Sequence, residues 1–506
     1  MGRVVAVVGG GISGLGAARV LAGGPLTAPG ADLDGKRVRL RGDDTAEVVL
    51  LESDDRFGGK VLSGEFRGRP IDFGPDNFLT RNRSIAELCS QLGIDDDLTS
   101  PATSSASVVA RGRLHPLPAG LVLGLPPDLF VLARSRIVSA RGLARAALDL
   151  VPLGSPMSAS SLGLAPAAIP PGARPCEGGG PEWSAASILE RRLGRELVER
   201  LVDPLLGGIN AGGLDHLSLT VVAPQVSQAL VGHRSITRAL QEMMRNRPVA
   251  PSAKGAKPLP FFLGMRGGLG RIVAELVADL HRRGVTLRTG TAVTTLRKRA
   301  DRFELETADG TLVADGVVLA APGHVSARLL VEEAPVAAAE LGSIPHSSVA
   351  LVTFAWASDA IAGLTGSGFL APRCEGRIVT GCTYLSAKWP YTAAPGEVVI
   401  RTSSGRYGDD RASSMSDEQL VEAVLGELRQ LIGTDAPPLA TQVQRWRQAF
   451  PQYLPGHLGK IERARAALGQ LPAIALAGAS LGGIGIPACL TSGERAAAEV
   501  VDRLGA

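Results

Sequence analysis

A glycine-rich turn close to the N-terminus constrains this chain more than any other feature. Val4–Val8 is a run of small, β-favouring residues, and it leads directly into the pattern Gly9-x-Gly11-x-x-Gly14. A helix-like pattern follows over Leu15–Leu21. Strand, G-x-G-x-x-G and helix in this order form the dinucleotide fingerprint, in which the glycines allow a tight turn, a close pyrophosphate and close helix packing. We therefore predict a dinucleotide at this turn, with its phosphates at the helix N-terminus.

The second half of the fingerprint is an acidic residue that ends the next strand. Val48–Leu51 is apolar and is followed by Glu52, which is placed to accept hydrogen bonds from a ribose. The gap from the first glycine is longer than the usual spacing of about 20 residues, and residues 23–46 are predicted to be an inserted loop. A glycine motif alone would be weak evidence for dinucleotide binding, because other α/β proteins also have glycine-rich turns. The acid makes the dinucleotide interpretation much more specific.

Length and composition exclude several classes of protein. The chain has 506 residues, which predicts two or three domains. Its net charge is +4, from 53 basic and 49 acidic residues, and no basic block with interleaved aromatics occurs, so we expect no nucleic-acid partner. Five cysteines and seven histidines are scattered without ligand spacing, so no metal site is expected and a reducing compartment is favoured.

One uncharged segment could be mistaken for a membrane span. Residues 471–490 carry no charge over a length that could cross a bilayer. The segment also contains Pro472, Pro487 and several glycines, so we predict a buried strand followed by a loop. We expect a cytoplasmic protein and leave peripheral membrane contact open.

Periodicity and breaker residues predict most of the secondary structure. A capping box at Ser187 and Glu190 begins one helix, and Pro204 ends it. An Asp309-Gly310 turn joins two strands. Further helices are predicted over 84–92, stopped by Gly93, and over 134–150, 272–280, 417–431 and 492–504. Strands are predicted over 285–287, 292–297, 303–307, 317–321, 348–354 and 397–402, and residues 154–180 read as a low-complexity loop.

Several residues admit both a chemical and a structural interpretation. Ser480 lies in a G-x-S-x-G pattern, but no histidine follows it, so a glycine turn against the cofactor is favoured over a hydrolase. His457 could act as an acid or base, although a loop-holding role is preferred. Trp446 and Tyr453 could stack on a flat ring or simply pack a loop. Arg81 could pair with a substrate carboxylate or be solvated.

The cofactor signals lie at the start of the chain, near residue 290 and at its end. The dinucleotide domain must therefore be assembled from separated segments, and this favours FAD over NAD, because a large prosthetic group spans such a domain. The fold class predicted is α/β: a Rossmann-like FAD-binding domain with an inserted α+β substrate domain and a helical subdomain that faces membrane or substrate. The predicted bounds are 1–84, 262–330 and 468–506 for the FAD domain, 85–205 for the helical subdomain, and 206–261 and 331–467 for the substrate domain.

Motifs along nearly the whole chain resemble the flavin-dependent protoporphyrinogen/coproporphyrinogen oxidases, within the amine oxidase-like flavoproteins. The most specific are Asp203-Pro-Leu-Leu-Gly-Gly-Ile-Asn-Ala-Gly212, Pro451-Gln-Tyr-x-x-Gly-His457 and Gly478-Ala-Ser-x-x-Gly-Ile-Gly-Ile-Pro487. The resemblance implies that FAD is bound by Gly9, Gly10, Gly11, Ile12, Ser13, Gly14, Glu52, Ser53, Lys60, Gly74, Pro75, Asp76, Asn77, Val293, Trp446, Ile484, Gly485 and Ile486. It names no catalytic base, and Arg81 is the one candidate for a substrate carboxylate.

The resemblance also implies the reaction. A tetrapyrrole, coproporphyrinogen III, would be oxidised to coproporphyrin III in haem biosynthesis by hydride transfer from methylene bridges to flavin N5, with oxygen as acceptor and release of hydrogen peroxide. Protoporphyrinogen IX is the alternative substrate, and an amine oxidase, a carotenoid desaturase or a non-catalytic tetrapyrrole carrier are further alternatives. Transient contact with the next enzyme of the haem pathway, and the oligomeric state, are left open.

Overall fold

The computed structural model describes residues 2–27, 46–151, 156–157, 183–246, 259–361 and 363–505. Most of the inserted loop 23–46 and nearly all of the low-complexity loop 154–180 lie outside these residues. The chain forms two compact units, and each is built from separated segments. The first comprises 1–100, 259–345 and 458–506, and the second comprises 101–258 and 346–457. The roles predicted for the domains from the sequence stay predictions.

A five-stranded parallel sheet organises the first unit. Its strand order is β10-β2-β1-β14-β20, so strands from three distant segments lie side by side. Strands β1 and β2 belong to the first segment, β10 and β14 to the second, and β20 to the third. The bounds are Val4–Val8, Glu47–Leu51, Thr286–Arg288, Gly316–Leu319 and Ala473–Leu476. The predicted Rossmann-like α/β architecture from separated segments is confirmed.

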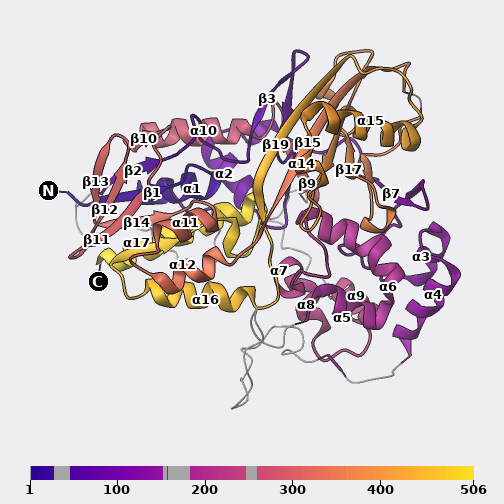
Figure 1. The fold of residues 1–506 in the computed structure, drawn as a ribbon, viewed down its shortest axis with the longest axis horizontal. Coiled ribbons are helices and arrows are strands. Elements are labelled where there is room, and N and C mark those ends of the chain that lie inside the picture. The colour runs from indigo at the N-terminus through magenta and orange to yellow at the C-terminus, as the bar shows by residue number, and fades with distance from the viewer. Residues whose placement is uncertain are drawn as a thin grey trace, which may run out of the picture. The chain divides into compact units, whose positions relative to one another are not determined.

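Helices cover both faces of this sheet (Figure 1). Alternate residues of β1 point to opposite faces, as a strand requires: Val5 and Val7 belong to one apolar core, and Ala6 and Val8 to the other. The first core includes α1, α2, α10 and α17, with bounds Ile12–Leu21, Ser84–Leu92, Gly270–Arg282 and Ile486–Gly505. The second includes α11, α12 and α16, with bounds Gly323–Leu329, Pro335–Gly342 and His457–Leu468.

Smaller sheets complete the first unit. An antiparallel sheet β11-β12-β13 contains the turn predicted at Asp309-Gly310, which joins β12 to β13. The hairpin β3-β4 contacts α10, and the sheet β5-β9-β6 packs in the same apolar core as α2, which begins and ends where the sequence predicts. The bounds are Thr295–Arg299, Arg302–Thr307 and Gly310–Ala314, then Ser63–Phe66 and Arg69–Asp72, then Phe78–Leu79, Phe262–Met265 and Leu98–Thr99, with a 3₁₀ turn at Asp95–Asp97.

A seven-stranded sheet forms one half of the second unit. Its order is β19-β15-β18-β17-β16-β7-β8, antiparallel except between β16 and β7. Helix α15 (Asp417–Ile432) packs on it and begins with a complete capping box at Ser416 and Gln419. The strand bounds in the same order are Ala440–Pro451, His346–Ala357, Glu397–Ser404, Val379–Tyr384, Gly368–Leu370, Ser107–Ala110 and Arg113–Pro116, and α13 and α14 are Leu385–Lys388 and Arg411–Ser414.

The other half of the second unit is helical, and here three predictions are wrong. The helix predicted over 134–150 is two short helices separated at Arg136, whose left-handed backbone (φ 57°) ends the first of them. The predicted capping box at Ser187 is also absent, because Ser184 caps the helix three residues earlier. The helices α3, α4, α5, α7, α8 and α9 are Leu129–Ser135, Ala140–Ala147, Ala185–Leu193, Leu219–Val222, Pro224–Leu230 and Ile236–Arg245.

A π-helix over Val198–Gly207 follows the short helix α6 (Arg195–Leu197). Pro204 lies inside it, so the prediction that this proline ends the helix is wrong. Wide π-helical turns are rare and often mark functional segments. Asp203 lies in this π-helix, and its Oδ1 accepts a hydrogen bond from Leu214 N at 2.9 Å, which joins the π-helix to the segment that follows Gly207.

No helix among the described residues is both long enough and apolar enough to span a bilayer. Residues 471–490 form β20, a 3₁₀ turn at Ala479–Leu481 and the beginning of α17. The predicted strand is therefore present. The last helix begins at Ile486 rather than at the predicted Ser492, since Pro487 fits a first helical turn, where its missing N–H has no partner to lose.

Candidate functional site

The carboxyl ends of the parallel strands lie level with one another. Val8 pairs with Leu51 on one side and with Leu319 on the other, and Leu319 pairs in turn with Leu476. The turns that follow these residues therefore meet at one edge of the sheet. Ligands of open α/β sheets bind at this edge, and most of the residues predicted to bind the cofactor belong to these turns or to the loops beside them.

The three fingerprint glycines have different surroundings. Gly9 has a left-handed backbone (φ 107°), which favours glycine. A Cβ on Gly14 would overlap the carbonyl oxygen of Gly9, so the helix can approach the strand only because residue 14 has no side chain. A Cβ on Gly11, by contrast, would meet no protein atom within 4 Å. The packing of the protein does not require glycine at position 11, which fits a backbone that a ligand approaches closely.

Helix α1 begins without a side-chain cap. Its N-cap residue is Gly11, which has no side chain to cap the helix, and no side-chain cap is formed among the described residues. Uncapped N–H groups and the helix dipole together favour an anion at such an end. Ile12 and Ser13 of this turn are buried. Gly493 of α17 packs against the backbone of Ser13, and a Cβ there would overlap its carbonyl oxygen. No motif in the sequence indicates this contact.

Glu52 is buried, at 8% exposure, and its carboxylate joins two loops. One oxygen, Oε2, accepts a hydrogen bond from Gly10 N at 2.5 Å. The other, Oε1, accepts from Asp54 N at 2.9 Å and from the Ser53 hydroxyl at 3.0 Å. A carboxylate has about four acceptor positions, so one remains for a further donor. The position agrees with the predicted ribose role, and the carboxylate also holds the glycine turn in place.

Glu52→Gln should weaken FAD binding about tenfold to a hundredfold. The amide would turn an NH₂ group toward either Gly10 N or Asp54 N, so one donor would face another donor. Losing a hydrogen bond to a charged group costs about 1.5–3 kcal/mol, and about 1.4 kcal/mol is a factor of ten in affinity. Reconstitution of flavin-free protein, followed by flavin fluorescence, measures the dissociation constant. Glu47→Gln, at the exposed start of β2, is the matched control and should bind FAD normally.

The Gly58-Gly59-Lys60 loop lies directly against the fingerprint. Gly58 N donates to Gly10 O at 2.8 Å, and Gly58 forms a parallel bridge with Gly11. Lys60 is partly exposed to solvent. Protein atoms packed around the rest of the side chain desolvate its ammonium group, and this lowers its pKa. A lysine in this position can contact an anionic ligand bound at the helix start.

The turn over Gly74–Asn77 follows the β3-β4 hairpin. Gly74 packs against the Lys60 backbone so closely that a Cβ would overlap the Lys60 carbonyl oxygen. Asp76 is buried and accepts a hydrogen bond from the Asn77 side-chain amide at 2.8 Å, while Pro75 is half-buried. The structure thus brings Lys60 and this turn together, and the contact of both with FAD stays a prediction.

Two further segments reach the same edge of the sheet. Thr291 N donates to Glu52 O at 2.8 Å, and Val293 lies two residues further along the chain from this contact. Ile484 and Gly485 lie in the turn between β20 and α17, and Ile486 begins α17. These are the places predicted for the adenine and flavin ends of the cofactor. Contact with FAD at each residue stays a prediction.

The remaining candidates lie on other elements. Trp446 lies on β19 in the second unit, so its predicted place beside the flavin stays a prediction. Arg81 is exposed in the first unit. Tyr453 is 1% exposed and its ring contacts that of His457 edge-on, with centroids 4.8 Å apart. This geometry agrees with the structural interpretation of Tyr453 and His457 as residues that hold a loop.

Ser480 has a structural partner. Its hydroxyl accepts a hydrogen bond from Gly323 N at 3.0 Å, and it lies in a 3₁₀ turn rather than at the start of an α-helix. The hydroxyl therefore joins the turns that follow β14 and β20. The geometry of a nucleophile elbow is not formed.

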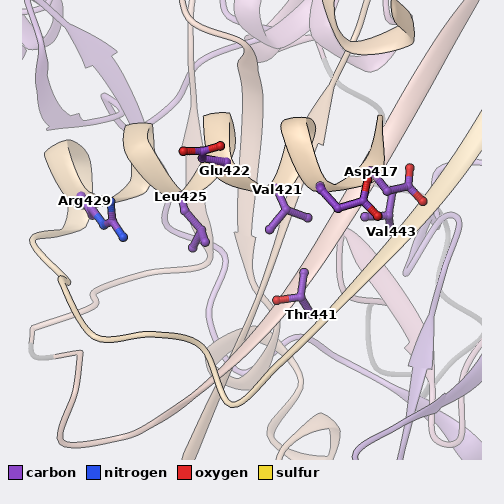
Figure 2. Close-up of a pocket in the computed structure, with 8 residues that line it drawn as sticks. Asp417, Val421, Glu422, Leu425, Arg429, Thr441 and Val443 are labelled. Carbon is purple, nitrogen blue, oxygen red and sulfur yellow. The ribbon is translucent and has the colours of Figure 1, made fainter. Parts of the chain in front are cut away.

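A separate groove lies on the second unit between α15 and β19 (Figure 2). It has a volume of about 600 Å³, and none of the predicted cofactor or substrate residues lines it. Its lining residues are Asp417, Glu418, Val421, Glu422, Leu425, Arg429, Thr441 and Val443. Within the described residues, no cluster of three or more histidine, cysteine or carboxylate side chains could hold a metal ion.

Comparison with known proteins identifies the class to which this fold and turn cluster belong. Residues 12–501 match the family model described as flavin containing amine oxidoreductase. The chain therefore belongs to the family of flavin-containing amine oxidoreductases, and its cofactor is FAD.

Individual relatives narrow the comparison. The chain is 32% identical to the coproporphyrinogen III oxidase of Bacillus subtilis, over 99% of this chain and 98% of that one. It is 30% identical to the protoporphyrinogen oxidase of Bos taurus, over 99% of both chains. A solved structure from Exiguobacterium sp. 255-15, provisionally named a protoporphyrinogen oxidase, superposes with a TM-score of 0.78 at 28% identity, covering 97% of each chain.

Proposed function

We propose that this chain is an FAD-dependent oxidase that converts coproporphyrinogen III to coproporphyrin III in haem biosynthesis. The observation that carries the proposal is the similarity, over essentially the whole length, to the Bacillus subtilis coproporphyrinogen III oxidase. The turn cluster of the first unit supports the cofactor part, because glycines, a helix N-terminus and a buried carboxylate converge at one sheet edge. Solved amine oxidases such as cyclohexylamine oxidase share the fold at 18% identity, which carries no argument for amine substrates.

The residues of the turn cluster are assigned roles on this basis. FAD, when bound, accepts the hydride equivalents that the substrate loses. The start of α1 binds the diphosphate, and Lys60 contributes a positive charge beside it. Glu52 accepts a hydrogen bond from the adenosine ribose. Trp446 and the Ile484–Ile486 turn contact the flavin, and Val293 contacts the adenine through its backbone. Oxygen is the proposed acceptor, with hydrogen peroxide as its product.

A substrate comparison under anaerobic conditions tests the proposal. Coproporphyrinogen III should bleach the flavin absorbance of the holoenzyme, and air should restore it with release of peroxide and appearance of porphyrin fluorescence. Protoporphyrinogen IX is the second arm, because the Bos taurus relative carries that name. Faster bleaching by protoporphyrinogen IX would reassign the substrate. A flavin that neither porphyrinogen bleaches would refute the proposal, and unchanged flavin with tight porphyrin binding would favour a carrier.

Peripheral contact with an anionic membrane is a further part of the proposal. Phe130 on α3 is 70% exposed, and Leu148, which directly follows α4, is 53% exposed. Two exposed arginines lie on these helices, Arg134 on α3 and Arg141 on α4. Apolar side chains beside cationic ones are typical of surfaces that bind lipid headgroups. Phe130→Ser together with Leu148→Ser should reduce sedimentation with phosphatidylglycerol vesicles. Sedimentation equal to that of the wild type would contradict this part. Contact with the next enzyme of the pathway is proposed without a surface assigned to it.

A further inference from the structure

The last helix of the first unit packs against its first helix. Helices α17 and α1 contact each other in one apolar core. Three consecutive residues of α17 each contact a different segment of this unit: Ser492 contacts the turn after β20, Gly493 contacts the first turn of α1, and Glu494 contacts the chain that follows α1. Two of these segments carry residues that are predicted to bind FAD, so α17 joins parts of the chain that must act on one ligand.

Gly493 lies against the first turn of α1. A Cβ on Gly493 would overlap the carbonyl oxygen of Ser13 and would lie 2.8 Å from its carbonyl carbon. Ser13 is 5% exposed and belongs to the turn whose N–H groups have no side-chain cap among the described residues. Backbone cannot rotate aside as the end of a side chain can, so any side chain at position 493 would displace either this turn or α17.

Ser492 and Cys489 hold the turn between β20 and α17. The Ser492 hydroxyl accepts a hydrogen bond from Gly478 N at 3.1 Å. Gly478 has a positive φ of 117°, which favours glycine, and begins this turn. One helical turn before Ser492, the Cys489 thiol donates to Gly483 O at 3.4 Å, near the other end of the turn. Burial raises the pKa of this thiol to about 11, so at neutral pH it keeps the proton that it donates. Helix α17 therefore fixes both ends of the turn that leads into it.

Glu494 adds a contact beyond the far end of α1. It is 3% exposed, and its Oε1 accepts hydrogen bonds from Thr27 N at 3.1 Å and from the Thr27 hydroxyl at 2.8 Å. Thr27 follows the end of α1 at Leu21. Between the two ends of α1, a Cβ on Gly16 would lie 2.6 Å from Leu490 Cδ1. Close-packed interiors transmit a displacement, so a change in the backbone contact of α17 reaches the first turn of α1.

We propose that Ser492 and Gly493 are positioning residues for FAD. They hold the first turn of α1 and the turn after β20 at the separation that one FAD molecule spans. The first of these turns is assigned to the diphosphate and the second to the flavin, so the inference rests on the roles proposed above. A ligand that must fit two turns at once binds tightly only when both are held in place before it binds. Neither residue is among those predicted to bind FAD, and the role requires no contact with it.

ADP and adenosine separate the diphosphate part of this binding from the adenosine part. Both ligands carry adenosine, and only ADP carries the diphosphate. The full chain, freed of flavin, should bind ADP more tightly than adenosine by about tenfold or more, as measured by isothermal titration calorimetry. Gly493→Ala should weaken ADP binding by about tenfold and leave adenosine binding unchanged, because the first turn of α1 is displaced. A variant that keeps the wild-type preference for ADP, or a wild type without one, would overturn the proposal.

A merely structural role for Gly493 gives a different result. Loss of stability alone would lower the melting temperature and weaken ADP and adenosine alike. The ratio of their dissociation constants would then stay at the wild-type value, and the proposal would be overturned. Gly16→Ala is the control within the same helix pair, because its Cβ would first meet the flexible end of the Leu490 side chain. It should lower the melting temperature and keep the preference for ADP. An equal loss of that preference in both variants would also overturn the proposal.

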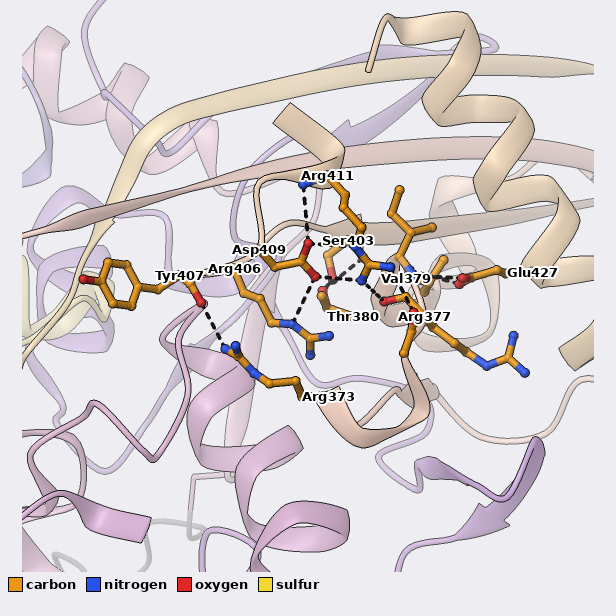
Figure 3. A network of polar contacts seen from close by, with 12 residues as sticks. Arg373, Arg377, Val379, Thr380, Ser403, Arg406, Tyr407, Asp409, Arg411 and Glu427 are labelled. Carbon is orange, nitrogen blue, oxygen red and sulfur yellow. Dashed lines mark hydrogen bonds and ion pairs between the residues drawn. The ribbon is translucent and has the colours of Figure 1, made fainter. Parts of the chain in front are cut away.

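A control for destabilisation as such comes from the second unit. Glu427 on α15 accepts hydrogen bonds from Ile378 N at 2.8 Å and from Val379 N at 3.0 Å. Figure 3 shows Glu427 in a polar network of that unit, and none of the residues labelled there is predicted to bind FAD. Glu427→Ala removes the acceptor of two backbone N–H groups and should lower the melting temperature. The wild-type preference for ADP should remain, since the network contains no part of the two cofactor turns.

Ser492→Ala keeps the test decisive if Gly493→Ala does not fold. It adds no atom and removes the acceptor for Gly478 N. Loosening the turn after β20 should raise the dissociation constant of FAD by about threefold or more, measured by flavin fluorescence, and leave ADP binding unchanged. FAD binding equal to that of the wild type would overturn the proposal. None of these measurements uses a porphyrinogen, so a chain that binds FAD but oxidises neither porphyrinogen would refute the proposed function alone.

Discussion

Gly14→Ala should yield protein that is unstable and colourless. The added Cβ would overlap the Gly9 carbonyl oxygen, so helix α1 would have to move away from β1. Overpacking of this kind costs about 1–3 kcal/mol and more where the backbone cannot move. Here the obstacle is the backbone of Gly9, which cannot turn aside as a side chain would, so we expect the upper end of that range and loss of FAD. Thermal unfolding and the 450 nm absorbance per chain measure the two effects.

Gly11→Ala should separate cofactor binding from folding. A Cβ at this position would meet no protein atom within 4 Å, and its backbone conformation (φ −69°, ψ 177°) is open to any residue. The variant should therefore fold as well as the wild type and bind at least tenfold less FAD, because the methyl group would point where the diphosphate approaches. Gly426→Ala, in the middle of α15 with free space around it, should leave colour unchanged and slightly raise stability. Normal flavin content in Gly11→Ala would contradict the assignment of this turn.

Asp279→Ala should destabilise the first unit by about 3–5 kcal/mol, because it leaves a buried arginine without its partner. Arg19 on α1 is 2% exposed, and its Nε donates to Asp279 Oδ2 on α10 at 3.0 Å. Arg283 donates to the same oxygen at 2.8 Å. Urea unfolding of the holoenzyme measures the loss. Glu275→Ala, on the same helix, is the matched control, because Glu275 forms no ion pair with any residue that the structure describes. An equal loss in both variants would contradict the role of the pair.

The same carboxylate predicts a dependence on pH. Burial alone would raise the pKa of Asp279, but hydrogen bonds and charges from Arg283 and Arg19 outweigh it and hold the pKa below its ordinary value. A depressed carboxyl pKa contributes stability above the unfolded-state value of about 3.9, and this contribution is lost as the pH falls through the folded-state value. Burial lowers the pKa of Arg19, which nevertheless stays charged over this range. The stability difference between wild type and Asp279→Ala should therefore shrink below about pH 4.

Local sequence signals predicted helix ends and turns correctly where a residue type has a single structural role, as glycine has in a left-handed turn. Gly93 ends α2 in a left-handed conformation (φ 72°), and Asp309-Gly310 forms a hairpin turn, both as the sequence indicates. The fingerprint order of strand, turn and helix was likewise sufficient to predict β1 and α1. Helix bounds failed where tertiary contacts override such signals. Pro204 lies inside a π-helix, and Ser184 rather than Ser187 caps α5.

Some residues of the candidate site could be predicted from the sequence and others could not. The glycine turn and Glu52 could be identified from the sequence because their spacing follows from how a backbone must approach a dinucleotide. The contact between Gly493 and Ser13, and the buried pair of Arg19 with Asp279, could not be identified. These residues are far apart in sequence or lie in segments without a motif, and only the packing of strands and turns makes them neighbours.

The sequence by itself determined the fold class, the cofactor and the family, because each depends on short patterns whose chemistry is local: glycines that admit a backbone, an acid that ends a strand, and motifs that recur along the chain. Only the tertiary structure decided which strands lie side by side and which charged groups pair. The order β10-β2-β1-β14-β20 joins three distant segments, and the buried pair of Arg19 with Asp279 exists because helices α1 and α10, far apart in the sequence, pack against each other. Pairing and charge balance are properties of positions in space, so the order of residues alone cannot express them.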